Sequence, residues 1–274
     1  MFYEGSEKRL EITCTLDLLK FDDQFWEVMV KHAGANIISY IENKHVKAFL
    51  LSESSLFVWK NRLLLITCGE THLLQASLYF QKRVERQQII SLLFQRHQAV
   101  YPERQKSNFQ QDNLLLQQQL KGDSHHWSAD YCGDIFLFGN NQQCFSTKNI
   151  LMLHGLAGTF FTELQCAKVS ASKVASQLKL SAHFKNFIID QHSFDPKGYS
   201  VNAIHGESYF TLHITPEKLS SYLSFESNLE AHDVINFQHH LLALFQPQRH
   251  YLMAFSPSKK ALEITTKTLI ANTI

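Results

Sequence analysis

The first stretch of the sequence that could carry out chemistry is a short polar segment between two apolar runs. Glu53, Ser54 and Ser55 separate residues 46–51 from residues 56–60, and both runs are rich in branched and aromatic side chains. Serine hydroxyls and a carboxylate can act as nucleophile, acid or base when a fold activates them. On composition alone, such a segment is typical of a β-turn in which these side chains hydrogen-bond to the backbone.

Six segments together resemble a known enzyme family. They are residues 2–8, 51–58, 67–69, 198–202, 213–217 and 222–228. Cys68 follows Ser54 by fourteen residues, and this spacing is the most specific part of the pattern. In their order and spacing the segments resemble eukaryotic-type S-adenosylmethionine decarboxylase, a pyruvoyl-dependent enzyme. The resemblance spans nearly the whole chain, although residues 105–180 match poorly.

The resemblance implies that the chain makes its own cofactor. Decarboxylation of an α-amino acid leaves a carbanion that needs an electron sink, which pyridoxal phosphate often supplies through a Schiff base. This family uses a pyruvoyl group instead. By analogy, the Ser54 hydroxyl attacks the carbonyl of Glu53, and elimination and hydrolysis leave the pyruvoyl group at position 54. The predicted autocatalytic cleavage lies between Glu53 and Ser54 and converts the zymogen into residues 1–53 and 54–274.

The same resemblance implies catalytic roles for four further residues. His213 corresponds to the group that removes the α-proton of the reacting serine, and Ser200 to a serine that assists processing. Cys68 corresponds to the acid that protonates the substrate after CO2 leaves, which suits a thiol because its ordinary pKa of ~8.5 lies near the operating pH. Glu7 corresponds to an acid needed in processing and activity. Without the resemblance, these would be a core histidine, a turn-capping serine, a buried cysteine and a solvated carboxylate.

The substrate implied by the family is S-adenosylmethionine, and its decarboxylated product supplies spermidine biosynthesis. Tyr3 and Phe194 correspond to the aromatic pair that sandwiches the adenine, because stacked rings favour a flat base between them. Glu217 corresponds to the carboxylate that accepts both ribose hydroxyls. Leu51 and Glu53 contribute mainly backbone next to the adenine. For Phe194 the alternative interpretation is ordinary core packing.

Animal members of the family bind putrescine in a buried acidic cluster that speeds processing and catalysis. Two acidic positions of that cluster fall on Phe145 and Asn149 of this chain, and a linked lysine falls on Ile66. The remaining acid, Glu226, would need a basic partner such as Arg96, since a lone buried carboxylate is costly. We therefore do not expect activation by putrescine.

Hydrophobic periodicity predicts both strands and helices. Strands are expected at residues 8–19, 36–41, 46–51, 56–60, 63–68, 184–190, 209–214, 222–226, 251–255 and 261–266, and helices at 22–32, 71–84, 108–120 and 232–245. Without a strict strand–helix–strand rhythm, this mixture indicates an α+β fold with mostly antiparallel sheets. The family resemblance implies a four-layer α/β/β/α sandwich with two mainly antiparallel β-sheets, formed by residues 1–274 as a single domain.

Composition excludes several other classes of protein. The 274 residues carry 26 Lys and Arg against 25 Asp and Glu, a net charge of +1 that predicts no nucleic-acid partner. The 10 glycines never form a G-x-G loop for nucleotide phosphates. The cysteines and histidines lack ligand spacing, so no metal is expected. We expect no signal peptide, no membrane span and reduced thiols, which together predict a cytoplasmic protein. The sequence leaves a monomer and a homodimer equally open.

Two other functions are compatible with parts of the pattern. One is a pyruvoyl decarboxylase of another amino acid, and the other is an inactive homologue that binds and regulates a partner. A smaller amino acid would not need the aromatic pair and the ribose-binding carboxylate. An inactive copy would not need the reacting serine, the thiol, the assisting serine and the histidine all intact.

The expected insensitivity to putrescine is testable in the purified protein. Because the cluster positions have lost their charges, millimolar putrescine should leave the rates of cleavage and decarboxylation unchanged. An animal enzyme assayed in parallel is the control. A several-fold rise in either rate would contradict the expectation.

Overall fold

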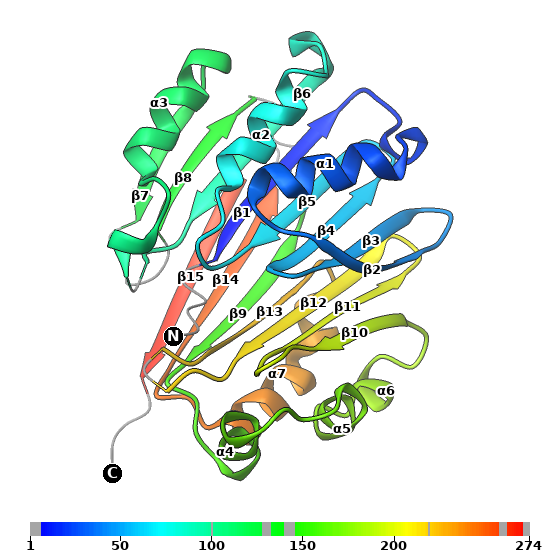
Figure 1. Cartoon of the computed structure of the whole chain (residues 1–274), viewed down its shortest axis with the longest axis vertical. Coiled ribbons are helices and arrows are strands. Elements are labelled where there is room, and N and C mark those ends of the chain that lie inside the picture. The colour runs from blue at the N-terminus through cyan, green and yellow to red at the C-terminus, as the bar shows by residue number, and fades with distance from the viewer. Residues whose placement is uncertain are drawn as a thin grey trace. The chain divides into compact units, whose positions relative to one another are not determined.

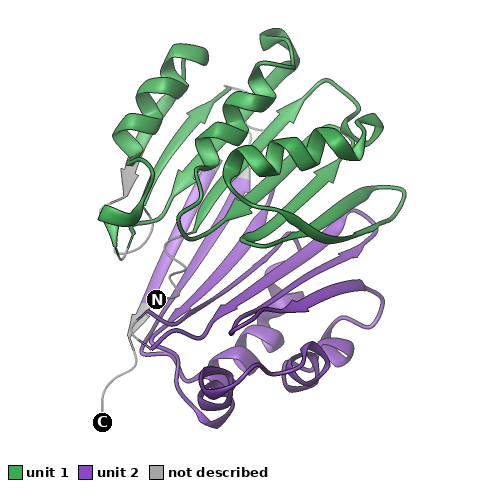
Figure 2. Ribbon diagram, in the orientation of Figure 1, with its two compact units in different colours: residues 1–145, 259–261 green, residues 146–258, 262–274 purple. Residues whose placement is uncertain are grey.

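The computed structural model describes residues 7–99, 101–127, 133–139, 146–218, 220–257 and 262–270. In them the chain forms an α+β fold with two antiparallel sheets (Figure 1), which confirms the predicted class. The chain divides into two compact units, residues 1–145 with 259–261 and residues 146–258 with 262–274 (Figure 2). No helix in the described part of the chain is both long and apolar enough to cross a membrane.

Unit 1 contains an eight-stranded antiparallel sheet with the strand order β2-β3-β4-β5-β1-β6-β8-β7. Its strands are β1 (Lys8–Cys14), β2 (Ile37–Glu42), β3 (Val46–Leu51), β4 (Ser54–Trp59), β5 (Arg62–Thr67), β6 (Ile89–Arg96), β7 (Asp123–Trp127) and β8 (Gly133–Phe138). Its helices are α1 (Asp23–Ala33), α2 (Leu73–Gln81) and α3 (Phe109–Gln119), with short 3-10 turns at Leu18–Lys20, Arg86–Gln88 and Pro102–Arg104. Among the candidate residues of this unit, Leu51 ends β3 and Ser54 begins β4, while Glu7 directly precedes β1 and Cys68 directly follows β5.

Local signals explain where the helices of unit 1 begin and end. The Asp22 side chain accepts the Phe25 N–H at 2.7 Å, so Asp22 is the N-cap of α1. Gly34 ends that helix with a φ of 86°, a left-handed conformation that glycine adopts without steric cost. Trp26 and Phe80 from the helices pack on the inner side chains of the sheet in one apolar core. These helices therefore lie over one face of the sheet (Figure 1).

Unit 2 contains a seven-stranded antiparallel sheet with the strand order β10-β11-β12-β13-β9-β14-β15. Its strands are β9 (Lys148–His154), β10 (Ile188–Ser193), β11 (Tyr199–His205), β12 (Ser208–Thr215), β13 (Tyr222–Ser227), β14 (Arg249–Pro257) and β15 (Leu262–Ile270). Its helices are α4 (Thr159–Cys166), α5 (Ala171–Gln177), α6 (Leu180–His183) and α7 (Ala231–Phe245). The strand expected at residues 184–190 is partly wrong, because Phe184 directly follows α6 and the strand begins at Ile188.

An aromatic cluster explains this difference in unit 2. The rings of Phe184 and Phe210 lie 4.1 Å apart, and Phe184 meets Phe237 of α7 edge-on at 4.9 Å. An apolar, aromatic stretch reads as a strand by composition, but burial of Phe184 under α7 favours an irregular connection instead. Polar residues alternate with core residues along β12, so Thr211 and His213 lie on the face of the sheet opposite its helices.

Candidate active site

Ser54 occupies a strained position at the start of β4. Strands β3 and β4 form a hairpin in which Leu51 pairs with Ser54, so Ser52 and Glu53 make a two-residue turn. The composition indicated such a turn. The φ of Ser54 is 129°, a value that residues other than glycine rarely adopt. The side chain of Ser54 is buried. The backbone conformation therefore costs energy at the peptide bond predicted to break.

The carbonyl of Glu53 receives donors from Cys68. Because Ser54 pairs with Thr67 across β4 and β5, the next residue brings its backbone to Glu53. The Cys68 N–H donates to the Glu53 carbonyl oxygen at 3.1 Å, and the Cys68 Sγ lies 3.5 Å from the same oxygen. Donors aimed at a carbonyl stabilise the negative charge that develops when a nucleophile adds to it. The arrangement favours attack at this carbon.

The carboxyl group of Glu53 lies in a partly buried electrostatic environment. Burial raises the pKa of Glu53, with a smaller upward contribution from Glu70, while Lys8 acts in the opposite direction. The Cys68 Sγ lies 4.0 Å from the Glu53 Oε2. The thiol thus lies between the carbonyl and the carboxyl group of one residue.

Glu7 is buried in an ion pair, so a solvated surface charge is not what the structure shows. The Arg9 Nη2 donates to the Glu7 Oε2 at 2.9 Å, and the Arg9 Nη1 donates to the Gln95 Oε1 at 2.9 Å. Arg9 pairs in register with Ile66, the position at which the resemblance places a lysine. A cation therefore stands on the neighbouring strand, at the position that pairs with Ile66.

Ser200 and His213 meet on adjacent strands of unit 2. They pair in register across β11 and β12, and the Ser200 Oγ lies 2.7 Å from the His213 Nδ1. The Thr211 Oγ1 lies 2.9 Å from the His213 Nε2 and donates to the Asn202 Oδ1 at 2.9 Å. Since that hydroxyl proton goes to Asn202, Nε2 is the ring nitrogen that donates and Nδ1 the one that accepts from Ser200.

Sequence reasoning did not assign a role to Thr211 or to Asn202. The signal for both was their alternation with core residues, which places them on the same face as His213. Together with the serine they orient the imidazole from both ends. The ring can therefore present a basic nitrogen in a defined direction.

The two substrate-binding candidates of unit 2 lie in loops beside the sheet. Phe194 follows β10, its N–H donates to the Gly198 carbonyl at 3.0 Å, and its ring meets His192 edge-on at 4.8 Å. Its side chain is half-buried, unlike the fully buried phenylalanines of the core. Glu217 follows β12, its carboxylate accepts from the Ser220 hydroxyl, and its carbonyl accepts from Gln165 at 3.1 Å.

Arg96 and Glu226 each have a hydrogen-bond partner within their own unit. The Arg96 guanidinium binds Asp112 of α3, with the Nη1 2.6 Å from the Oδ2. Glu226 accepts the Tyr209 hydroxyl at 2.6 Å. The sequence could not show this because Asp112 lies in the poorly matching stretch and Tyr209 reaches Glu226 only through strand pairing.

The predicted site residues gather in two groups, one in each unit. Unit 1 contains Glu7, Leu51, Glu53, Ser54 and Cys68, and unit 2 contains Phe194, Ser200, His213 and Glu217. Tyr3 lies outside the described residues. In each group the residues come from central strands or from the turns directly next to them.

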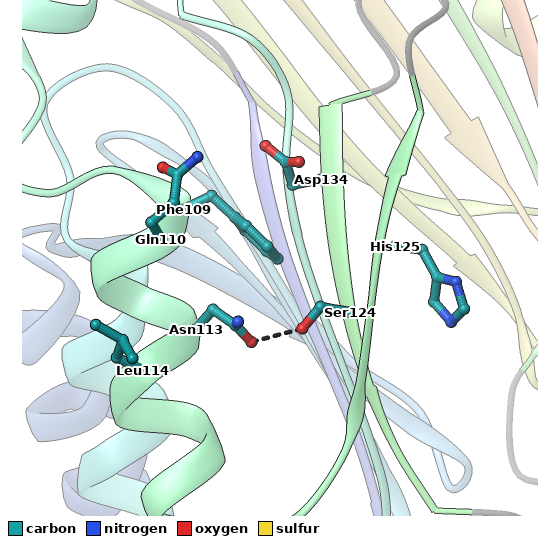
Figure 3. A pocket seen from close by; sticks show the side chains of 7 residues that line it. All are labelled: Phe109, Gln110, Asn113, Leu114, Ser124, His125 and Asp134. Atoms are coloured by element: carbon teal, nitrogen blue, oxygen red, sulfur yellow. Dashed lines mark hydrogen bonds between the residues drawn. The ribbon is translucent and has the colours of Figure 1, made fainter.

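A separate open groove lies between α3 and the strands β7 and β8 of unit 1 (Figure 3). It has a volume of about 510 Å³, and Phe109 forms part of its wall. The Ser124 hydroxyl donates to the Asn113 Oδ1 at 2.6 Å across it. None of the predicted site residues lines this groove, so it is not the candidate active site.

Comparison with known proteins identifies the family. Residues 1–272 match the adenosylmethionine decarboxylase family model. The chain belongs to this family. The match includes the stretch that resembled the family poorly by motif, so membership rests on the whole chain.

Individual relatives agree with the family match. The chain is 30% identical to an S-adenosylmethionine decarboxylase proenzyme of Leishmania donovani, over 94% of this chain and 75% of the relative. It is 29% identical to that of Dictyostelium discoideum, over 90% of this chain and 73% of the relative. The crystal structure of the Trypanosoma brucei AdoMetDC-delta26 monomer matches with a TM-score of 0.59 and 24% identity, over 73% of this chain and 79% of that one. This structural likeness supports the fold.

Proposed function

We propose that this chain is a self-processing, pyruvoyl-dependent decarboxylase of S-adenosylmethionine that acts in the cytoplasm and supplies spermidine biosynthesis. The observation that carries the proposal is the strained φ of 129° at Ser54, directly after a carbonyl that accepts the Cys68 N–H. Such strain persists only where the surrounding structure imposes it, and it concentrates at reactive positions. Membership of the family supplies the reaction to which the strain is suited.

Processing begins with the hydroxyl of Ser54. Its Oγ attacks the carbonyl carbon of Glu53, and the bond from that carbon to the Ser54 nitrogen breaks. The hydroxyl proton passes to that nitrogen, which becomes a free amine, and an ester links the two residues. The Cys68 N–H and thiol stabilise the negative oxygen of the tetrahedral intermediate. Release of the strained backbone conformation favours this rearrangement.

Elimination then requires a base. His213 removes the α-proton of residue 54, and the ester bond breaks so that Glu53 leaves with a terminal carboxylate. Hydrolysis of the resulting dehydroalanine consumes water and releases ammonia, which leaves the pyruvoyl group. Support for this role is the His213 ring itself, since Nε2–H donates to Thr211 and the basic Nδ1 faces Ser200. Ser200 assists by orienting the ring.

The residues around position 54 fit a pyruvoyl group. A serine is present there, its side chain is buried, and the thiol of Cys68 lies beside the preceding carbonyl. A bound pyruvoyl group supplies the electron sink for decarboxylation. The chain contributes the other parts: Cys68 donates a proton to the substrate α-carbon, and Glu7 keeps a buried charge beside Arg9.

Substrate recognition is assigned to loop and strand-end residues. Phe194, together with Tyr3, stacks on the adenine, and the half-buried ring of Phe194 leaves surface for that contact. The carboxylate of Glu217 accepts the ribose hydroxyls, in exchange for its bond to Ser220. Leu51 provides backbone at the end of β3, and Glu53 provides backbone in the turn that follows. Neither alternative function gains support from an observation of its own.

The cleavage site is tested by intact mass under denaturing conditions. Wild-type protein should split between Glu53 and Ser54, and the second chain should be blocked at its N-terminus. Ser54→Ala should abolish cleavage and CO2 release, because it removes the attacking hydroxyl. Ser55→Ala, which changes the neighbouring buried serine, should still cleave. An uncleaved wild-type chain would contradict the proposal.

The proton-donor role is tested at Cys68. Cys68→Ala retains the backbone N–H, so the chain should still cleave, but CO2 release from S-adenosylmethionine should fall by ~100-fold or more. Cys14→Ala, which removes another buried thiol of the same unit, should keep nearly full turnover. Turnover by Cys68→Ala within twofold of wild type would be incompatible with the role.

The base is tested at His213. His213→Ala should stop processing at the ester, so the intact mass is that of the uncleaved chain but hydroxylamine splits it at position 54. His205→Ala, an exposed histidine on the neighbouring strand, should process normally. Normal spontaneous cleavage of His213→Ala would refute the assignment.

A further inference from the structure

Lys8 is a buried lysine whose ammonium group binds the turn after Cys68. Lys8 is the first residue of the central strand β1, and only 2% of it is exposed. Its Nζ donates to the carbonyls of Gly69 and Thr71 at 2.8 Å each and lies 3.4 Å from the Thr71 Oγ1. All of these acceptors belong to the turn between β5 and α2. One side chain therefore binds two carbonyls and one hydroxyl of the segment that carries the thiol.

Other side chains hold the same turn. The Thr71 hydroxyl donates to the Cys68 carbonyl at 2.7 Å. The Gln105 Nε2 donates to the Gly69 carbonyl at 3.2 Å, and Gln105 in turn lies 3.4 Å from Arg96 through its Oε1. The Gly69 carbonyl thus accepts hydrogen bonds from a charged donor, Lys8, and from a neutral donor, Gln105.

Charged groups surround Lys8 on several elements. The pKa of Lys8 is lowered to about 7, mainly by burial and also by the charge of Arg96 of β6, while Cys68, Asp112 and Glu53 act in the opposite direction. The pKa of His72, at the start of α2, is lowered mainly by burial, and Asp112, Arg96 and Lys8 also act on it. Electrostatic coupling is reciprocal, so a positive charge on Lys8 favours the thiolate of Cys68 as much as the thiolate favours that charge.

We propose that Lys8 is a positioning residue for Cys68: its ammonium group fixes the turn that carries the thiol and makes that thiol a stronger acid. This inference rests on the proposed role of Cys68 as proton donor, and it adds a residue to which the family resemblance assigned no role. A stronger acid near neutral pH suits proton transfer to carbon, because a donor works best when its acidity matches the operating pH.

A purely structural role for Lys8 predicts a different effect of substitution on the acidity of Cys68. Methionine has a similar length and would fill the same space without the cost of burying a charge. If Lys8 only fills space or supplies hydrogen bonds, removing its charge leaves the acidity of Cys68 unchanged. If Lys8 acts as proposed, the loss of charge alone weakens the acid.

The experiment measures the titration of Cys68 by 13C NMR of protein labelled at cysteine Cβ, with Cys68→Ala used to assign the signal. Lys8→Met should raise the titration midpoint of Cys68 by about one pH unit, or about tenfold less thiolate at a given pH. The same variant should show a lower kcat, little change in KM and an activity profile displaced to higher pH. An unchanged midpoint would overturn the proposal.

Three control variants separate charge from structure. Lys60→Met makes the same substitution at an exposed lysine and should leave the midpoint unchanged. Gln105→Leu removes the neutral donor to Gly69 but keeps the charge of Lys8, so the midpoint of Cys68 should again be unchanged. Lys8→Gln keeps a donor without charge and should raise the midpoint. If Lys8→Met does not fold, a wild-type midpoint in Lys8→Gln overturns the proposal.

The titration does not depend on decarboxylase activity. If wild-type protein releases no CO2 from S-adenosylmethionine but Lys8→Met still displaces the midpoint, the proposed function fails and the link between Lys8 and Cys68 stands. If the enzyme is active and the midpoint is unchanged, only the role of Lys8 fails.

Discussion

The hydrogen bond from the Cys68 N–H to the Glu53 carbonyl is the interaction on which the unit 1 site depends. It exists because β4 and β5 pair in a register that sets Ser54 opposite Thr67. The hairpin turn between β3 and β4 then leaves Ser54 at a positive φ. A slip of one residue in this register would reverse the faces of the side chains and separate the thiol from the carbonyl.

In unit 2, too, the register of paired strands brings the candidate residues together. Ser200 and His213 are thirteen positions apart in the sequence but directly opposite on paired strands. The alternation of β12 directs its apolar side chains to the helices and its polar side chains to the other face. A strand can therefore contribute to the core and to the candidate site at once, without an extra loop to carry the catalytic groups.

Buried charges form a second common feature of unit 1. Arg9 with Glu7 and Arg96 with Asp112 are ion pairs of low exposure, and Lys8 uses backbone carbonyls. Burying such groups is costly unless hydrogen bonds compensate, so their retention is a weak argument for stability. Lys8 binds the Cys68 turn directly and Arg96 reaches it through Gln105, and charges act strongly on neighbouring acids where water is scarce.

The sequence by itself determined the family and the α+β class, and it is the source of the proposed roles of Ser54 and Cys68, because these depend on residue types at short, specific spacings and on local periodicity. Only the tertiary structure decided the positive φ of Ser54, the Arg96–Asp112 pair and the contact of Lys8 with the Cys68 turn. These three features depend on which strands and helices become neighbours. Lys8 and Gly69, for example, are separated by 61 positions and meet only when the sheet forms.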